Sequence, residues 1–236
     1  MTSASQTSNA LPLYVQISEL LIRDIAAGRL IDGERLPPER DMAEELGISI
    51  GTLRKALADL TKKGLLERIQ GSGNYIRQGG TQESVYAMFR LELLSGGGLP
   101  RADVLDVERV RKPEVLPAFG TSDQGTRIRR LRYLNDIIIA VEEIWLDGDS
   151  GTVKKEMLSE SLYRYYQKNL GFWIVRAEDR VTIDEVPSWA PDVFSMQPGT
   201  VTGYIERFSW ADRPKPVEFS RTWFDTDRAH YVQRLK

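Results

Sequence analysis

The sequence predicts an α+β protein of two domains, a helical domain that ends in a two-stranded ribbon and a larger domain built on an antiparallel sheet. Apolar residues recur at helical spacing in three segments between 11 and 64, and a glycine-containing ribbon pattern follows them. Beyond residue 85 strand-like runs dominate, and all five tryptophans lie beyond residue 140. We therefore expect a disordered tail over 1–10, a first domain over 11–76, a linker over 77–84 and a second domain over 85–236.

The composition is that of an ordinary globular protein. The 236 residues are 41% hydrophobic and 28% charged, with no cysteine and one histidine. Disulfides, thiolate metal sites and histidine metal clusters are excluded, and we expect neither a metal nor a cofactor. No apolar run reaches membrane-spanning length and the N-terminus lacks the regions of a signal peptide, so we predict a cytoplasmic protein with no membrane partner. The net charge of −2 excludes a uniformly basic surface, although 49–77 holds six basic residues against two acidic ones.

Three helices account for most of the first domain. The stretch LYVQISELLIRDIAAGRL has helical apolar spacing up to Gly28, and Pro37-Pro38 opens a second helix that stops at Gly47. Ser49 then caps a third helix, which ends at 64. The apolar residues of this third helix fall on one stripe: Leu53, Ala56, Leu57 and Leu60.

The tight turn between the second and third helices is typical of a helix-turn-helix motif, and the ribbon LLERIQGSGNYI that follows is typical of a wing. In such a motif the second helix of the pair enters the major groove of DNA with its N-terminal residues against the base edges. For charged residues there, the alternative is a solvated helix face. The residues predicted to face double-stranded operator DNA are Ser49, Ile50, Gly51, Thr52, Arg54 and Lys55.

Strand pairs dominate the second domain. TRIRRLRYL and IIIAVEEIWL flank Asn135-Asp136 and predict one hairpin, and VTGYIERFSWA and KPVEFSRTWF flank DRP and predict another. RAEDRVTIDEV is typical of a further strand, and helical segments are expected near 159–169 and 188–196. Without a βαβ alternation, these elements predict an antiparallel sheet.

The first domain resembles, over its whole length, the winged helix-turn-helix domain of GntR-type bacterial transcription factors. The segments that carry the resemblance are LPPERDMAEELG and TLRKALADLTKKGLLERIQGSG. The resemblance implies that Arg40 and Arg54 contact bases or phosphates, and that the wing lies along the minor groove. Closing a hairpin is a compatible role for the wing's glycines. The wing residues in question are Gly71, Ser72 and Gly73.

One residue departs from the family pattern. The family usually has an arginine directly after the capping serine, where it often reaches a guanine, but this chain has Ile50. Isoleucine donates no hydrogen bond and can only pack against a thymine methyl group or a sugar, or lie exposed. We therefore expect an operator that differs from the family's common sequence at that step. Arg40 has its own alternative, an ion pair with Glu44 one turn on.

The second domain is similar to the ligand-binding half of the HutC-like subfamily, a UTRA domain with a chorismate-lyase-like fold. The segments that carry this similarity, in chain order, are LPRADVL, RRLRYLND, EEIWL, SLY and PVEFSRTWFDTDR. The similarity implies an effector-binding domain. The residues expected to bind the effector are Phe89, Arg90, Arg130, Arg132, Glu142, Ser161, Tyr163, Glu218 and Phe224.

The two strand arginines indicate the charge of the effector. Arg130 and Arg132 share one face of a strand because side chains alternate. Two guanidiniums suit a phosphate or a carboxylate, which they can grip with paired hydrogen bonds. The similarity to the HutC-like subfamily also implies effector contact here. The alternative is cross-strand ion pairing with Glu142 or Glu143.

The other candidates have separate reasons. The helix start at 161–163 offers free N–H groups that attract anions, or only ordinary helix-start chemistry. Glu218 and Phe224 fall on one alternating face, where the family often has a tyrosine in place of Phe224. Phe89 and Arg90 match an entry segment in which sugar-phosphate sensors tend to carry Phe-Ser. Arg90 would add positive charge near an anionic ligand or occlude the site.

The sequence therefore predicts a ligand-responsive DNA-binding regulator. We expect a homodimeric repressor of a catabolic or uptake operon, released by a small anionic effector such as a sugar phosphate or an organic acid. One alternative is an activator, because the sign depends on operator position. Another is a lyase-like enzyme domain fused to a DNA-binding domain, although no catalytic residues are recognisable. The effector, the operator and the operon stay open.

Overall fold

The computed structural model describes residues 12–77, 88–158 and 161–234, which fall into two compact units. One unit contains the described residues of 11–92, 96–99 and 231–236, and the other contains 93–95 and 100–230. The disordered tail predicted at 1–10 lies outside the described residues. So does the linker predicted at 77–84, apart from Arg77.

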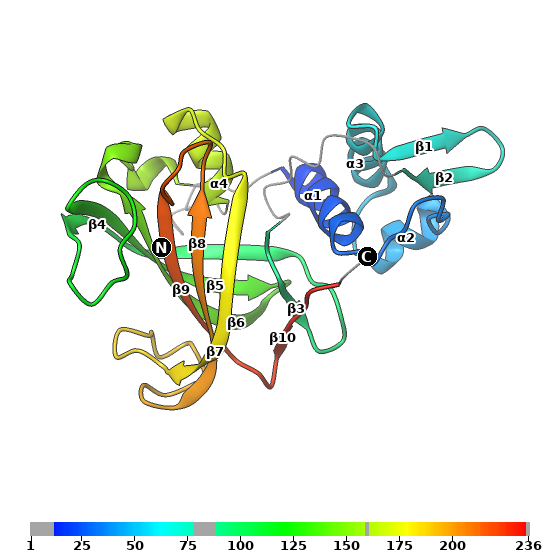
Figure 1. The fold of residues 1–236 in the computed structure, drawn as a ribbon. Helices are drawn as coiled ribbons and strands as arrows, with labels where there is room; N and C mark the ends of the chain where they lie inside the picture. The colour runs from blue at the N-terminus through cyan, green and yellow to red at the C-terminus, as the bar shows by residue number, and fades with distance from the viewer. Residues whose placement is uncertain (1–11, 78–87, 159–160, 235–236) are drawn as a thin grey trace, which may run out of the picture. The chain divides into compact units, whose positions relative to one another are not determined.

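The winged helix-turn-helix order predicted for the first domain is confirmed (Figure 1). The strands β1 and β2 pair antiparallel to form the wing. The predicted apolar stripe of the third helix is buried and packs with apolar residues of the other helices and of the wing, which gives this unit one core. The elements are α1 (Leu13–Ala26), α2 (Glu39–Glu45), α3 (Ile50–Lys62), β1 (Leu66–Ile69) and β2 (Gly73–Ile76).

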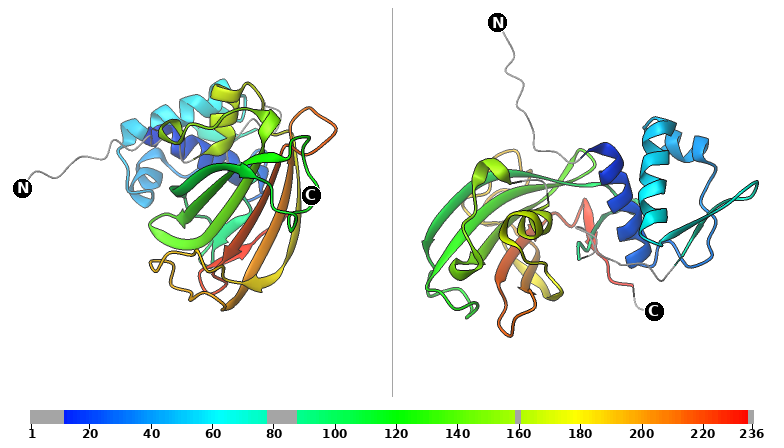
Figure 2. Two further views of the ribbon diagram at one scale, coloured as in Figure 1. Left: turned by 90° about the vertical axis from the view of Figure 1, so that its left-hand side faces the viewer. Right: turned by 90° about the horizontal axis from the view of Figure 1, so that it is seen from above.

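The second unit is built on a six-stranded antiparallel sheet in the order β4-β5-β6-β9-β8-β7, as the sequence predicted in kind. Figure 2 shows its strands twisting along the sheet, as sheets of L-residues do. A separate two-stranded sheet joins β3 and β10. The strands are β3 (Leu91–Leu93), β4 (Pro100–Arg111), β5 (Gln124–Leu134), β6 (Ile137–Asp147), β7 (Arg176–Glu185), β8 (Val201–Trp210), β9 (Glu218–Phe224) and β10 (Ala229–Tyr231).

Both predicted hairpins are present. The strands β5 and β6 meet at Asn135-Asp136, where Asn135 adopts a φ of 55°, a conformation that asparagine tolerates better than most residues. The strands β8 and β9 pair antiparallel across the second predicted turn, and the segment predicted as a single strand is β7. The edge strand β4 was not predicted as an element.

The predictions of helices in the second domain were less accurate than those of its hairpins. The one near 159–169 is a short helix, α4 (Leu162–Tyr165), continued by a π-helical turn, η3 (Tyr166–Leu170). Short 3-10 turns, η1 (Gly148–Ser150) and η2 (Lys155–Met157), precede it. The prediction of a helix near 188–196 is wrong, because this segment consists of turns. Pro191 lies in its middle, where proline removes a helical N–H and clashes with the preceding turn. No helix among the described residues is long and apolar enough to cross a membrane.

A close approach between β8 and β9 generates the first prediction. Gly203 lies opposite Phe224, and a Cβ added at Gly203 would come within 2.4 Å of the Phe224 ring. We expect Gly203→Ala to overpack the sheet and to lower the free energy of unfolding by about 1–3 kcal/mol, as measured by urea denaturation. The matched control is the double variant Gly203→Ala/Phe224→Leu. It should destabilise less than the sum of its single substitutions, and strict additivity would contradict the proposed clash.

Candidate functional sites

The start of α3 is capped from within its own first turn. The Ser49 hydroxyl accepts a hydrogen bond from the Thr52 backbone N–H at 3.1 Å, and its oxygen lies 2.9 Å from the Thr52 hydroxyl. This is the capping role expected of serine. Ile50 is 39% exposed, so a bulky apolar side chain stands in solvent at the start of the helix. The two hydroxyls of this turn are therefore engaged with each other, and Ile50 places an exposed apolar side chain beside them.

Charged side chains follow Ile50 on the exposed part of α3. Arg54 and Lys55 are both exposed, and the Arg54 Nε donates to the Glu39 carboxylate at 2.6 Å. Arg68 of the wing lies 3.5 Å from the same carboxylate. The hydrogen bond from Arg54 holds the pKa of Glu39 below its ordinary value, so this carboxylate is ionised at neutral pH. Glu39 therefore ties α3 to the wing.

The wing lies beside a groove. Gly71 adopts a φ of 76°, and a Cβ at that position would meet nothing within 4 Å, so glycine serves the backbone conformation here. The Ser72 hydroxyl lies 2.6 Å from the Tyr75 hydroxyl, and a Cβ at Gly73 would come within 3.0 Å of the Arg35 guanidinium. A cavity of about 650 Å³ opens between these residues and α2. It is lined by Arg35, Leu36, Pro37, Pro38, Glu39, Arg68, Ile69, Gln70, Gly71, Ser72, Gly73 and Asn74.

The residues predicted to contact DNA thus lie in this one unit, on α2, α3 and the wing. Arg40 is exposed, and no ion pair joins it to Glu44 in the described part of the chain. Sequence reasoning missed Glu39 and Arg35. The pattern PPER carries Glu39 immediately before Arg40, but only the fold brings its carboxylate to Arg54, fifteen residues away in sequence.

In the second unit, the predicted effector residues gather on one face of the large sheet, which we call the α4 face. Arg130 and Arg132 of β5 are buried and share the carboxylate of Glu142 on β6, with Arg130 Nη2 at 2.6 Å and Arg132 Nη1 at 3.4 Å. Burial alone would raise the pKa of Glu142, but the charges of Arg130 and Arg132 outweigh it and hold that pKa low. The cross-strand ion pair is therefore formed, with two guanidiniums facing one carboxylate.

Glu218 of β9 is surrounded by hydroxyl groups on the same face. Tyr166 donates to its carboxylate at 2.6 Å, Ser209 at 2.9 Å and Tyr163 at 3.4 Å. Burial raises the pKa of Glu218, and these hydrogen bonds oppose it only in part. Burial and the Glu218 charge together raise the pKa of Tyr163 to about 12, so its hydroxyl stays protonated. The face thus offers hydrogen-bonding hydroxyls beside its arginines.

Two further observations concern the remaining candidates on this face. Ser161 is buried and caps α4, accepting from the Arg164 N–H at 3.4 Å, so its hydroxyl has a structural role. Phe224 is buried against Gly203. Sequence reasoning missed Arg207 of β8, which pairs with Asp179 at 2.5 and 2.7 Å and whose charge opposes, without cancelling, the rise in the pKa of Tyr163. Strand alternation could have indicated that Arg207 lies on this face, together with Ile205 and Ser209.

Phe89 and Arg90 belong to the other compact unit. The guanidinium of Arg23 lies 5.9 Å from the Phe89 ring, and the Arg90 Nε donates to the Gln233 side chain at 2.8 Å. The expectation that these two residues join the effector site therefore stays a prediction.

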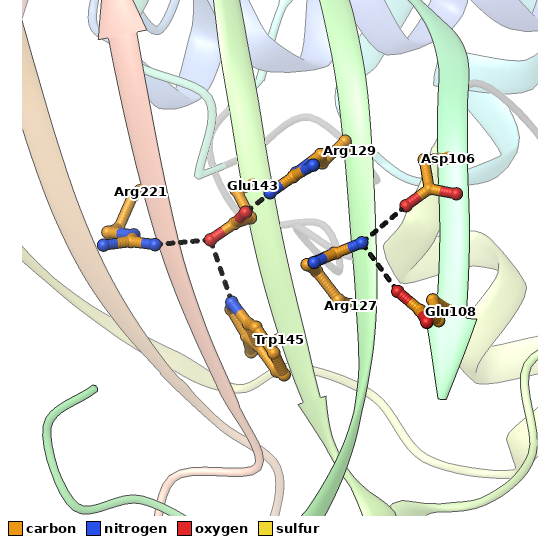
Figure 3. A network of polar contacts seen from close by, with 7 residues as sticks. All are labelled: Asp106, Glu108, Arg127, Arg129, Glu143, Trp145 and Arg221. Carbon is orange, nitrogen blue, oxygen red and sulfur yellow. Dashed lines mark hydrogen bonds and ion pairs between the residues drawn. The ribbon is translucent and has the colours of Figure 1, made fainter. Parts of the chain in front are cut away.

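The opposite face of the large sheet, which we call the network face, carries its own ionic network (Figure 3). Glu143 is 2% exposed and accepts from Arg129 at 2.9 Å, from Arg221 at 2.5 Å and from the Trp145 Nε1 at 3.0 Å. Arg127 pairs with two carboxylates of β4. The sheet therefore separates two sets of arginines, one on each face.

Comparison with known proteins agrees with this architecture. Residues 13–76 match the family described as bacterial regulatory proteins, gntR family, and residues 95–230 match the UTRA domain. The HTH-type transcriptional regulator SmoD of Agrobacterium fabrum is 56% identical over 98% of this chain and 99% of that protein. The chain belongs to the GntR family of bacterial regulators.

More distant GntR-family relatives align over nearly the whole chain. The mannosyl-D-glycerate transport/metabolism system repressor MngR of Escherichia coli is 31% identical over 92% of each chain. The HTH-type transcriptional repressor NagR of Bacillus subtilis is 27% identical over 95% of this chain and 96% of its own. The solved structure of the possible regulator YydK of B. subtilis shares the fold, with a TM-score of 0.54 and 19% identity, over 96% of this chain and 100% of that chain. The protein is a transcriptional regulator with an effector-binding UTRA domain, and not an enzyme.

The exposed end of α3 generates the second prediction. We expect Arg54→Ala to weaken operator binding about tenfold or more, because a cation that contacts a base edge contributes about 1–3 kcal/mol. The measurement is a titration of operator DNA followed by fluorescence anisotropy. Lys62→Ala, in the last turn of α3, removes the same charge far from the helix start and should change affinity less. Equal losses in both variants would mean that only overall charge matters.

Glu218 and Glu142 generate the third prediction, because their pKa values move in opposite directions from the ordinary 4.5. Glu218 holds its proton more tightly in the folded protein, so its contribution to stability is present below pH 4.5 and is lost as pH rises through its folded-state pKa. Glu142 contributes stability above pH 4.5 that is lost as pH falls through its lowered pKa. We therefore expect Glu218→Gln to gain stability relative to the wild type as pH rises, and Glu142→Gln to lose it.

Urea denaturation between about pH 3 and pH 7 measures both trends, because the Glu142 contribution is lost only below its ordinary pKa of 4.5. Each variant is the control for the other, because both substitutions remove one carboxylate from the same face. Parallel pH profiles in the two variants would contradict the assigned directions.

Proposed function

We propose that this GntR-family regulator is a homodimeric repressor of a catabolic or uptake operon, and that a small anionic effector bound on the α4 face releases it from DNA. The observation that carries the proposal is the pair of buried arginines, Arg130 and Arg132, which face one carboxylate. Relatives such as the mannosyl-D-glycerate transport/metabolism system repressor MngR support a repressor that controls the use of a small molecule.

The charges on the α4 face favour an anion. Three arginines lie on it, Arg130, Arg132 and Arg207, against the carboxylates of Glu142 and Asp179. Burial raises the pKa of Glu218, which disfavours its ionised form. A phosphate or carboxylate could pair with Arg130 and Arg132 through charge-assisted hydrogen bonds. The hydroxyls around Glu218 would suit the hydroxyl groups of a sugar or a hydroxy acid.

The arrangement also suggests how release would work. Effector binding can shift DNA affinity only if the effector binds more tightly to a protein state that fits the operator poorly. In a dimer that binds a palindrome, two recognition helices must match half-sites about 34–36 Å apart. An effector that favours a different spacing would therefore lower operator affinity. Whether such a protein represses or activates transcription depends on the position of the operator.

The fourth prediction tests the effector class. We expect a thermal-shift screen of sugar phosphates, organic acids and neutral sugars to give an anionic ligand that raises Tm by roughly 5–10 °C at a hundred times its Kd, which corresponds to about 2.7 kcal/mol. Arg132→Ala should abolish the shift. Arg129→Ala is the matched control, because Arg129 lies on the same strand but on the network face. The control should lower the starting Tm and keep the shift.

The same ligand should release operator DNA from the wild type but not from Arg132→Ala. A ligand that binds Arg132→Ala as tightly as the wild type would place the effector elsewhere. A hit that is uncharged would contradict the anionic class while leaving the repressor proposal intact.

A further inference from the structure

The segment 33–36, which leads into α2, is joined to the wing. It pairs with β2 through three backbone hydrogen bonds of 2.9 Å, and in this antiparallel pairing Arg35 lies opposite Tyr75. These bonds fix the backbone of Arg35 to the wing, so its side chain starts from a defined place in the sheet. The wing therefore consists of β1 and β2 with a third chain segment along the second edge of β2.

The side chain of Arg35 extends toward the turn of the wing. Facing residues of an antiparallel pair share one side of the sheet and side chains alternate along a strand, so Arg35, Tyr75 and Gly73 lie on one face of the wing. Gly73 adopts a φ of 141°, and a Cβ there would come within 3.0 Å of the Arg35 Nε and 3.6 Å of its Nη2. Because glycine has no side chain, Gly73 leaves room for this guanidinium beside the turn.

Arg35 is a cation whose donors are not engaged within the protein. It is exposed, and its side chain makes no ion pair or hydrogen bond with any residue that the structure describes. Arg54 and Arg68, by contrast, share the carboxylate of Glu39 at 2.6 and 3.5 Å. Arg35 and Arg68 both line the cavity of about 650 Å³ between the wing and α2. Arg35 therefore brings to this cavity a guanidinium whose hydrogen-bonding capacity is free.

The turn of the wing has no charged side chain of its own. Of the three residues between β1 and β2, Gly71 has no side chain and Gln70 is uncharged. The third, Ser72, has its hydroxyl paired with the Tyr75 hydroxyl at 2.6 Å. The unpaired positive charge beside this turn is therefore supplied by Arg35, from a neighbouring segment.

We propose that Arg35 enters the minor groove of operator DNA beside the wing turn and makes the protein favour A·T pairs at that step. The minor groove is narrow in A·T tracts, and the negative potential there attracts cationic side chains. A guanidinium is more weakly hydrated than an ammonium group, so it enters such a groove at a lower desolvation cost. The inference rests on the DNA binding of a GntR-family regulator, and it requires neither the effector nor the dimer proposed above.

A phosphate contact is the alternative for an exposed arginine, because most protein–DNA hydrogen bonds go to phosphates and sugars. Such a contact carries no sequence information, whereas a minor-groove contact separates A·T from G·C. The separation depends on the N2 amino group of guanine, which projects into the minor groove. Inosine lacks this amino group but keeps the major-groove edge of guanine, so an I·C pair isolates what the protein reads in the minor groove.

The test uses a DNA duplex selected from a random-sequence library on the full-length wild-type protein. Each A·T pair of the selected half-site and its flanks is replaced in turn by G·C and by I·C, and affinity is measured by fluorescence anisotropy. We expect one step in each half-site at which G·C weakens wild-type binding about fivefold or more, the low end for one wrong base pair. An I·C pair at the same step should restore the affinity.

Substitutions at Arg35 then assign this step to its side chain. Arg35→Ala should weaken binding to the selected duplex and should bind the A·T, G·C and I·C forms of that step equally well. Arg35→Lys keeps the charge but loses the guanidinium, and should retain only part of the A·T preference. Lys62→Ala is the matched control, because it removes one exposed positive charge from the last turn of α3. It should keep the full penalty for G·C. Circular dichroism of each variant should match the wild type.

The outcomes separate this contact from DNA binding itself. If Arg35→Ala binds all three duplexes more weakly by the same factor and keeps the wild-type penalty for G·C, Arg35 contacts a phosphate and the proposal is overturned. A wild-type protein for which no step shows loss with G·C and recovery with I·C also overturns it. Both results leave the proposed repressor and its effector screen untouched. A wild-type protein that selects no duplex overturns the inference together with the DNA binding on which it rests.

Discussion

The register between β5 and β6 decides where each charge of the effector domain lies. Arg130 is opposite Glu142 and Arg129 is opposite Glu143, so neighbouring residues on each strand send their charges to opposite faces. Because the side-chain period of a strand is two, a slip of one residue would move every arginine to the other face. A slip in one direction would set Arg130 opposite Val141 and Arg132 opposite Ile139, two apolar residues, at a desolvation cost. The Asn135-Asp136 turn and the paired charges therefore specify the same register.

On each face of the large sheet, two arginines pair with one glutamate. On the network face, Glu143 sits between Arg129 and Arg221, so two cations hold one buried anion (Figure 3). On the α4 face, the same ratio occurs at Glu142, and three hydroxyl groups surround Glu218. Buried ion pairs are weak sources of stability, because desolvation offsets much of the Coulomb attraction. Their value here is geometric, since they hold guanidiniums in fixed positions.

Much of this architecture could be predicted from local patterns. Helical spacing, the Ser49 cap and the Asn135-Asp136 turn each carry their own signal within a few residues, so the three helices and both hairpins were found. The turns at 188–196 were mistaken for a helix, because apolar residues at suitable spacing outweighed Pro191. Contacts such as Glu39 with Arg54 or Arg207 with Asp179 join distant segments and depend on packing. The candidate DNA and effector residues follow from local motifs and from strand alternation, whereas the groups that face them, such as Glu39 and Tyr166, are set by packing between distant segments.

The apolar start of α3 has a consequence for what the protein can distinguish. Ser49 and Thr52 bond to each other, and Ile50 stands exposed between them in the chain. An isoleucine that packs on a thymine responds to the methyl group at C5 of the base, and has no donor or acceptor with which to test the ring edge. A 5-methylcytosine presents that methyl group at the same place. At this one step, such a helix would respond to methylation of the DNA as it would to a change of base.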